Sequence, residues 1–159
     1  MNQPFQLGDE FLKESISAFE SMKKLADGTI SQLEDAHFYE TIDPESNSLE
    51  ILIKHMHGNM ISRWTDFLTT DGEFEVSRLP RAELLRLWEE GWERVFQALR
   101  SLTPEDVLRT VYIRGEAHTV LKAIQRQVSH YGYHVGQIVF LGKHLKSEHW
   151  QTLSIPRKR

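Results

Sequence analysis

Apolar residues recur every three or four positions along four long stretches of the chain, and this spacing limits its fold more than any other feature. On a helix of roughly 3.6 residues per turn such positions form one stripe, whereas a half-buried strand needs alternation. Each stripe has to be buried against a neighbouring element. The pattern predicts helices over residues 9–27, 49–68, 81–102 and 118–145.

The breaks between these stretches contain residues that favour turns and helix ends. Gly28 is predicted to interrupt the first helix, and Asn47 or Ser48 is predicted to cap the second. Residues 109–115 alternate and are rich in β-branched side chains. They predict a brief extended segment that ends at Gly115.

Four amphipathic helices with connectors of moderate length predict an all-α four-helix bundle. The chain has 159 residues, which is long enough to bury a core without disulfides. No repeat and no low-complexity tract divides it. We therefore expect a single domain that spans residues 1–159.

The charge distribution argues against a nucleic-acid partner. The formal net charge is −4, and acidic and basic residues are interspersed. The basic run at residues 157–159 is too short to follow a phosphate backbone. No apolar run approaches the roughly 20 residues that span a bilayer, and no secretory signal is visible. We expect a cytoplasmic protein that binds neither nucleic acid nor membrane.

Cysteine is absent, whereas histidine occurs eight times. The absence of cysteine excludes disulfides, thiolate nucleophiles of the chain itself and cysteine-based metal sites. Any transition-metal site therefore has to be built from histidines and carboxylates.

Two of these histidines, His130 and His134, are four residues apart in the last predicted helix. Such residues differ by about 40° around the helix axis and about 6 Å along it, so both imidazoles project from one face. Gln127 and Gln137 extend that face. The pair has the spacing to bind one metal ion. Two packed or exposed histidines are the alternative, because this spacing also arises by chance.

The second predicted helix contains two candidates for a third ligand. His55 and His57 lie about 200° apart around the axis, so at most one of them faces the core. His55 lies nearer the apolar stripe, which predicts His55 as the inward residue and His57 as the exposed one. Asn59 shares the face of His55. A core histidine bonded to a backbone carbonyl is the alternative for His55.

Other metal and catalytic motifs are missing from the chain. HExxH is absent, because Ser129 and Tyr131 flank His130. Glu34 and His37 form a single ExxH, whereas di-iron carboxylate bundles use two. GxSxG, P-loop and GxGxxG sequences do not occur.

A few further residues are singled out by position. Arg63 is predicted to be a solvated arginine. Arg126 either projects into a cleft, where it would bind an anionic group, or forms a surface ion pair. His118 lies near the start of the last predicted helix, which is a poor place for a cation. Trp88 and Trp92 are predicted to be core or interface residues, and they are candidates for an interface between two copies of the chain.

Three blocks together resemble a bacterial branch of the DinB/YfiT-like superfamily: "NSLEILIKHMHGNMISRWTDFLTTDGE", "IRGEAHTVLKAIQRQVSHYGYHVGQIVFLGK" and "WQTLSIPR". The resemblance runs from the second helix to the tail. It implies an up-down-down-up four-helix bundle, commonly a homodimer, with a three-histidine site for a divalent metal. Carried over residue by residue, the ligands are His55, His130 and His134. His57 stands where relatives have a small or apolar residue.

The resemblance also implies a function. Related proteins are similar to thiol S-transferases, which join a low-molecular-weight thiol to an electrophilic small-molecule substrate. The implied cofactors are a divalent metal ion, with zinc or nickel expected first, and such a thiol. Helical facing makes Asn59, Arg126 and Gln137 candidates for orienting the thiol. Metal-water hydrolysis and a non-catalytic, metal-binding role in stress responses are the alternatives.

Overall fold

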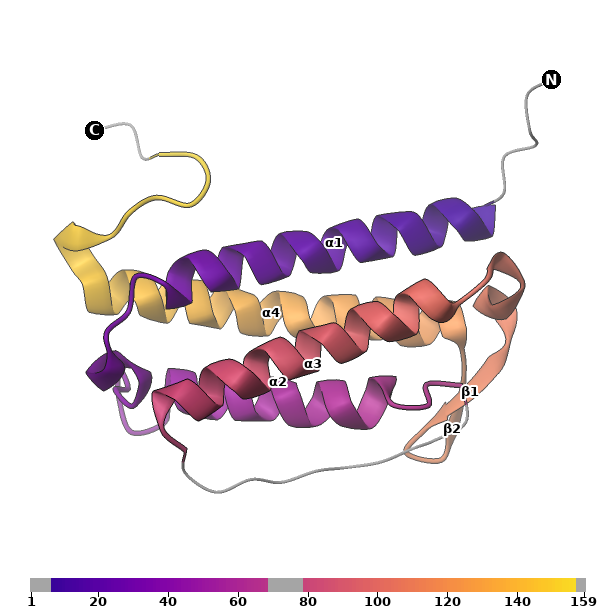
Figure 1. Ribbon diagram of the computed structural model, residues 1–159, viewed down its shortest axis with the longest axis horizontal. Helices are drawn as coiled ribbons and strands as arrows, with labels where there is room; N and C mark the ends of the chain where they lie inside the picture. Colours follow the sequence, from indigo (N-terminus) through magenta and orange to yellow (C-terminus); the bar gives the residue numbers. More distant parts are fainter. Residues whose placement is uncertain (1–6, 69–78, 157–159) are drawn as a thin grey trace.

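The computed structural model describes residues 7–68 and 79–156. Helices α1 and α4 run in one direction, and α2 and α3 run in the other (Figure 1). The predicted all-α, up-down-down-up bundle is therefore confirmed. The long helices are α1 (Leu7–Ile30), α2 (Leu49–Trp64), α3 (Arg81–Ser101) and α4 (Val120–Lys146), and short 3₁₀ turns cover Asp35–Phe38, Pro104–Leu108 and Ser147–His149.

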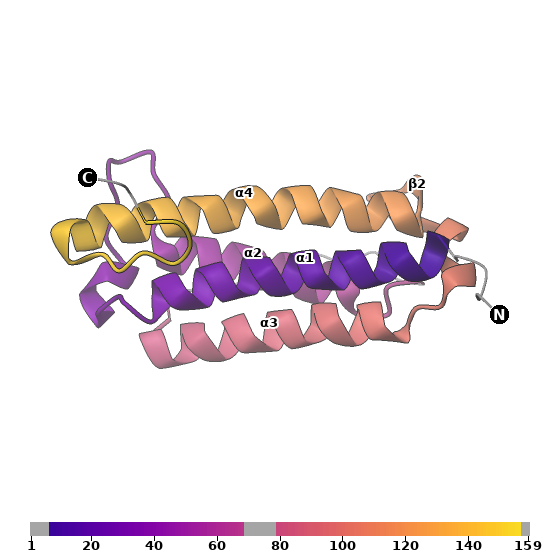
Figure 2. The same ribbon diagram turned by 90° about the horizontal axis from the view of Figure 1, so that it is seen from above.

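The helices pack as two parallel pairs, with α1 beside α4 and α2 beside α3 (Figures 1 and 2). Side-chain hydrogen bonds cap the first turns of two of them. The Ser48 hydroxyl accepts from the Ile51 N–H of α2, as predicted, and the Thr119 hydroxyl accepts from the Lys122 N–H of α4. No helix in the described residues has both the length and the apolar composition that crossing a membrane requires.

One aromatic side chain from each long helix meets at the centre of the core. The Phe19 ring centroid lies 5.7 Å from those of Trp64 and Tyr131 and 6.3 Å from that of Trp92. Trp88 packs edge-on against Trp92, and both indoles are buried inside the chain. The prediction that Trp88 and Trp92 form an interface with a second copy is therefore wrong, because the stripe of α3 faces its own core.

Gly28 does not interrupt the first helix, contrary to the prediction. Helix α1 continues to Ile30, and a Cβ at Gly28 would lie only 2.8 Å from a methyl carbon of Leu153. Gln32 and Gln151 exchange two hydrogen bonds between side chain and backbone nearby. The absent side chain at Gly28 thus makes room for the C-terminal segment, which lies along the end of α1.

A β-hairpin precedes the last helix. Strand β1 (Thr110–Ile113) pairs antiparallel with β2 (Glu116–Thr119). Between them Arg114 has a φ of 52° and Gly115 a φ of 77°, the left-handed values of a two-residue hairpin turn. The extended segment ending at Gly115 was predicted, but β2 was not. Helix α4 consequently begins two residues after His118, the predicted start, because cross-strand pairing holds His118 in β2.

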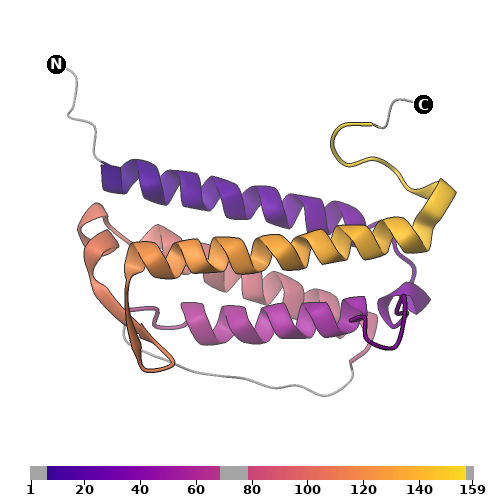
Figure 3. The ribbon, with the colours of Figure 1, turned by 180° about the vertical axis from the view of Figure 1, so that it is seen from behind.

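Helix α2 ends at Trp64, four residues before the predicted end at Leu68. Thr65 adopts an extended conformation and Asp66 has a φ of 48°, so the helix cannot continue. The sequence TTDGE at residues 69–73, with Gly72, also predicts a turn, but these residues lie outside the described part of the chain. The end of α2, the hairpin and the start of α4 lie together at one end of the bundle (Figure 3).

Candidate metal centre

Three histidines converge where α2 and α4 meet, one from α2 and two from α4. The Nε2 atom of His130 lies 3.1 Å from Nε2 of His55 and 3.1 Å from Nε2 of His134. One ring nitrogen from each of the three lies within 4.8 Å of the others. The structure thus brings together the three residues that the resemblance implied as ligands.

Two glutamines set the orientation of the α4 imidazoles. Oε1 of Gln137 lies 2.7 Å from Nδ1 of His134, and Oε1 of Gln127 makes a longer contact of 3.4 Å with Nδ1 of His130. An amide oxygen only accepts hydrogen bonds, so each Nδ1 donates its proton and leaves a lone pair on Nε2. Metal-binding histidines are held in the same way by acceptors behind the ring.

This donor set fits a divalent transition metal. The Nε2 lone pairs of His130 and His134 face each other at 3.1 Å, which is repulsive unless a cation lies between them. With metal–nitrogen bonds of about 2.0 to 2.1 Å, two ligand nitrogens lie about 2.9 Å apart in octahedral and about 3.4 Å apart in tetrahedral geometry. The two separations of 3.1 Å from His130 fall between these values. Imidazole nitrogen suits zinc and nickel.

The cluster is closed on the bundle side and open toward solvent. His134 is buried, His130 is half-buried and His55 is exposed. The prediction that His55 faces the core is therefore wrong. Helix α2 packs mainly against α3, so its inward face carries Met56 and Met60, and His55 lies at the rim beside α4.

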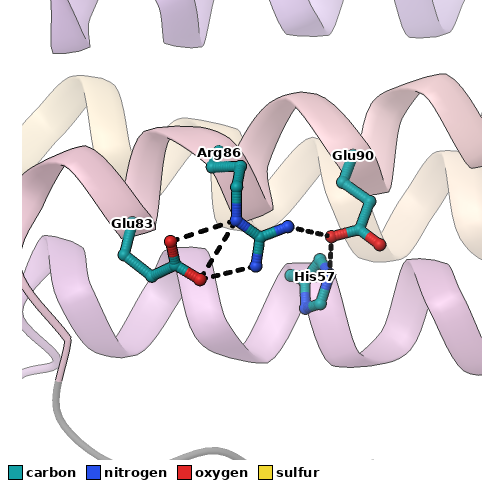
Figure 4. Close-up of polar contacts among 4 residues, drawn as sticks. All are labelled: His57, Glu83, Arg86 and Glu90. Atoms are coloured by element: carbon teal, nitrogen blue, oxygen red, sulfur yellow. Dashed lines mark hydrogen bonds and ion pairs between the residues drawn. The ribbon is translucent and has the colours of Figure 1, made fainter.

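His57, predicted to be exposed, is the buried histidine of α2, with 5% of its surface accessible. It faces α3, where its Nε2 lies 3.4 Å from a carboxylate oxygen of Glu90, which also pairs with Arg86 (Figure 4). Gly91 allows this close helix contact, because a Cβ there would lie 2.8 Å from Sδ of Met60. Burial lowers the pKa of His57, Glu90 opposes that shift, and Arg86 adds to it. His57 is a packing residue between helices.

The surroundings of His130 and His134 lower the pKa of both imidazoles. The pKa of His130 is lowered to about 4, and burial is the largest cause. The neighbouring imidazoles and the guanidinium groups of Arg126 and Arg63 lower it further. Burial also lowers the pKa of His134. At neutral pH these two histidines therefore need not lose a proton before they bind a metal.

A cavity of about 450 Å³ opens beside the histidines. This volume lies within the range of about 300 to 1,000 Å³ that is typical of small-molecule sites. A larger hollow of about 830 Å³, between α1, α3 and the C-terminal segment, contains no histidine, so we assign the chemistry to the smaller one. Besides histidines, the smaller cavity is lined by Asn59, Arg63, Arg114, Arg126, Ser129 and Tyr133, with Gln127 behind His130.

Asn59, Arg126 and Gln137, the residues predicted to orient the thiol, differ in their contacts. Asn59 lines the cavity, and its side-chain oxygen accepts a hydrogen bond of 2.8 Å from the Tyr131 hydroxyl. That hydroxyl in turn accepts from Nε1 of Trp64 at 2.9 Å, which fixes the position of Asn59. Arg126 also lines the cavity. Gln137 does not line the cavity, and its carboxamide oxygen contacts Nδ1 of His134.

Two arginines of this cavity were not anticipated. Arg63 was predicted to be solvated, but only 8% of its surface is exposed. Arg114 was overlooked because the hairpin was not predicted; the signal was an Arg-Gly pair between two short extended segments. His118 lies outside the cluster, buried in β2, with Nδ1 3.0 Å from the carbonyl oxygen of Glu116.

The sequence model of one family, described as "Protein of unknown function (DUF1572)", matches residues 6–159. The match spans nearly the whole chain and all three clustered histidines. The chain belongs to this family. No curated protein matches its sequence. Because membership of DUF1572 carries no stated activity, the functional argument has to come from the geometry of the site.

Proposed function

We propose that this DUF1572 protein binds one divalent metal ion through His55, His130 and His134. The observation that supports the proposal is the convergence of three Nε2 atoms, with separations of 3.1 Å from His130 to each of the others. The glutamine contacts at Nδ1 support it further, since they direct the lone pairs of two rings toward the same point.

We further infer that the chain is a member of the DinB/YfiT-like superfamily and a metal-dependent thiol S-transferase. A divalent ion held by neutral imidazoles keeps its full charge and lowers the pKa of a thiol or water that it binds. The chain has no cysteine, so the thiol has to come from a small molecule. The open side of the histidine cluster and the adjoining cavity provide room for it.

The side chains around the histidines have separable roles in this proposal. Gln127 and Gln137 hold imidazoles in the binding orientation. The Tyr133 ring packs against both α4 imidazoles, with centroid distances of 5.3 Å to His130 and 4.3 Å to His134, and forms part of the cavity wall. It thereby restricts the approach of the electrophile to one side.

Metal content tests the first part of the proposal. Protein purified without a chelator and without a nickel column should contain about one divalent ion per chain. His55→Ala and His134→Ala should lose it. His144→Ala removes an exposed histidine from the same helix as His134 and should retain the ion. Wild-type protein that holds no metal, and whose melting temperature is unchanged by zinc or nickel, would contradict the proposal.

Turnover tests the second part. With 1-chloro-2,4-dinitrobenzene, a small thiol gives its proton to solvent, its sulfur forms a bond to the ring carbon, and chloride leaves with the bonding electron pair. The metal-loaded protein should accelerate this reaction, and His134→Ala should not. Chelation should abolish the activity while circular dichroism shows an intact bundle. Ester hydrolysis without a thiol would instead support a hydrolase, and inactivity toward both would support a non-catalytic role.

A further inference from the structure

The cavity beside the histidine cluster is lined by positive charge from three separate elements. Arg63 comes from the last turn of α2, Arg114 from the hairpin turn and Arg126 from α4. None of the described residues that line the cavity is acidic. Three of its nine lining residues are thus arginines, although the net charge of the chain is −4.

Helix α4 directs an arginine and a ligand histidine toward the same cavity. Arg126, Ser129, His130 and Tyr133 are spaced by three or four residues and share one face of the helix, and all four line the cavity. A molecule that reaches His130 from this side therefore passes the guanidinium group of Arg126.

The arginines differ in exposure, and the difference suits them to binding an anion. Arg63 is almost fully buried, and both Arg63 and Arg114 also interact with other groups of the chain. Arg126 is exposed, and within the described part of the chain it forms no ion pair. Guanidinium groups bind carboxylate and phosphate through paired hydrogen bonds.

We propose that the cavity bounded by Arg63, Arg114 and Arg126 is an anion subsite. It selects small molecules that place a carboxylate or phosphate at the arginines while their reactive group lies at the histidine cluster. This inference rests on the proposed function, because it assigns the substrate class of the same site. Asn59, held in place by Tyr131, supplies a neutral polar group at the cavity wall.

A pair of thiols matched in length tests the subsite. 3-Mercaptopropionate and 3-mercaptopropan-1-ol offer the same thiol to the metal, but only the first carries an anionic group. Binding to cobalt-loaded protein is followed by the sulfur-to-cobalt charge-transfer absorption, which needs no turnover. We expect the carboxylate to bind about ten-fold more tightly than the alcohol, because it gains one charge-assisted hydrogen bond to a guanidinium group. The preference should shrink as salt is added.

Charge-matched variants identify the residues responsible. Arg126→Gln should remove most of the preference for the carboxylate over the alcohol. Arg126→Lys keeps the positive charge but lacks the paired donors of the planar guanidinium group, so it should retain part of the preference. Lys122→Gln removes one positive charge one turn earlier on the same helix, at a residue outside the cavity lining, and should leave the preference unchanged. The double variant Arg114→Gln/Arg126→Gln should abolish it.

The outcomes separate this inference from the proposed function. If both thiols bind the metal equally well, or if the double variant keeps the wild-type preference, the anion subsite is refuted and the thiol site stands. If neither thiol produces the absorption band, the proposed function fails, and this inference fails with it. Competition of 3-mercaptopropionate by acetate and by methylphosphonate distinguishes a carboxylate from a phosphate subsite, and Arg126→Gln should weaken the stronger competitor.

Discussion

Gly142 marks a close approach of α4 to α1, and replacing it by alanine should destabilise the protein. A Cβ at this position would overlap Cγ2 of Thr29 and would lie 3.3 Å from Cζ3 of Trp150. Thr29 is fully buried, and its hydroxyl donates a 3.0 Å hydrogen bond to the Leu25 carbonyl. That bond holds the rotamer, so the methyl group cannot rotate away without losing it.

The expected magnitude follows from two opposing terms. Alanine is favoured over glycine within a helix by about 1 kcal/mol. Overpacking a tight interior contact lowers the free energy of unfolding by about 1–3 kcal/mol. Overlap with Thr29 should cost an amount near the upper end of this range, because its β-branched side chain is rigid. We therefore expect Gly142→Ala to lower the free energy of unfolding by about 1–2 kcal/mol.

Gly136→Ala is the matched control for this substitution. Gly136 lies on the same helix, and among the described residues no atom outside the adjacent helix backbone comes within 4 Å of a Cβ built there. The variant keeps the helix-propensity gain without the clash, so it should be more stable than wild type by up to about 1 kcal/mol. Urea unfolding of the metal-free proteins, followed by circular dichroism, measures both changes.

A second substitution tests whether Thr29 is the cause. Thr29→Ser removes Cγ2 and keeps the hydroxyl, so the double variant Gly142→Ala/Thr29→Ser should recover much of the lost stability. The coupling free energy between the two substitutions should be favourable and about 0.5–3 kcal/mol, which is the usual range for residues in contact. If Gly142→Ala is as stable as Gly136→Ala, or if Thr29→Ser gives no rescue, the steric reasoning is wrong.

Three further predictions concern the site and the core around it. Gln137→Ala should weaken zinc affinity by about 10- to 100-fold in a chelator competition, because it removes the acceptor that holds Nδ1 of His134; unchanged affinity would contradict that role. Tyr131→Phe should lower the free energy of unfolding by about 1–3 kcal/mol in urea, because it leaves Nε1 of Trp64 without its acceptor in the core. Stability of the metal-free protein should fall as the pH drops below 6.5, because burial lowers the pKa of His57 and the unfolded chain therefore takes up the proton first. His57→Gln should lose less stability over that range, and equal losses in both proteins would refute the assignment.

The half of the site on α4 was predictable from local spacing. His130 and His134, and the glutamines beside them, share a face because helix geometry alone fixes the angle between residues three or four apart. The same geometry placed His55 and His57 on different faces, but it could not say which face would be covered. The periodicity favoured His55 as the inward residue, whereas the structure buries His57. The resemblance singled out His55, which the structure places in the histidine cluster.

The sequence by itself determined the four helices, a cap at Asn47 or Ser48 and the paired histidines, since each depends on interactions within a few residues. Tertiary structure decided which neighbour each face meets. Packing of α2 against α3 buried His57 and left His55 beside α4. Pairing of β1 with β2 brought Arg114 to the cavity where Arg63 also lies. Such contacts join residues far apart along the chain. Helical periodicity shows on which face of its own helix a residue lies, but it does not show which other element covers that face.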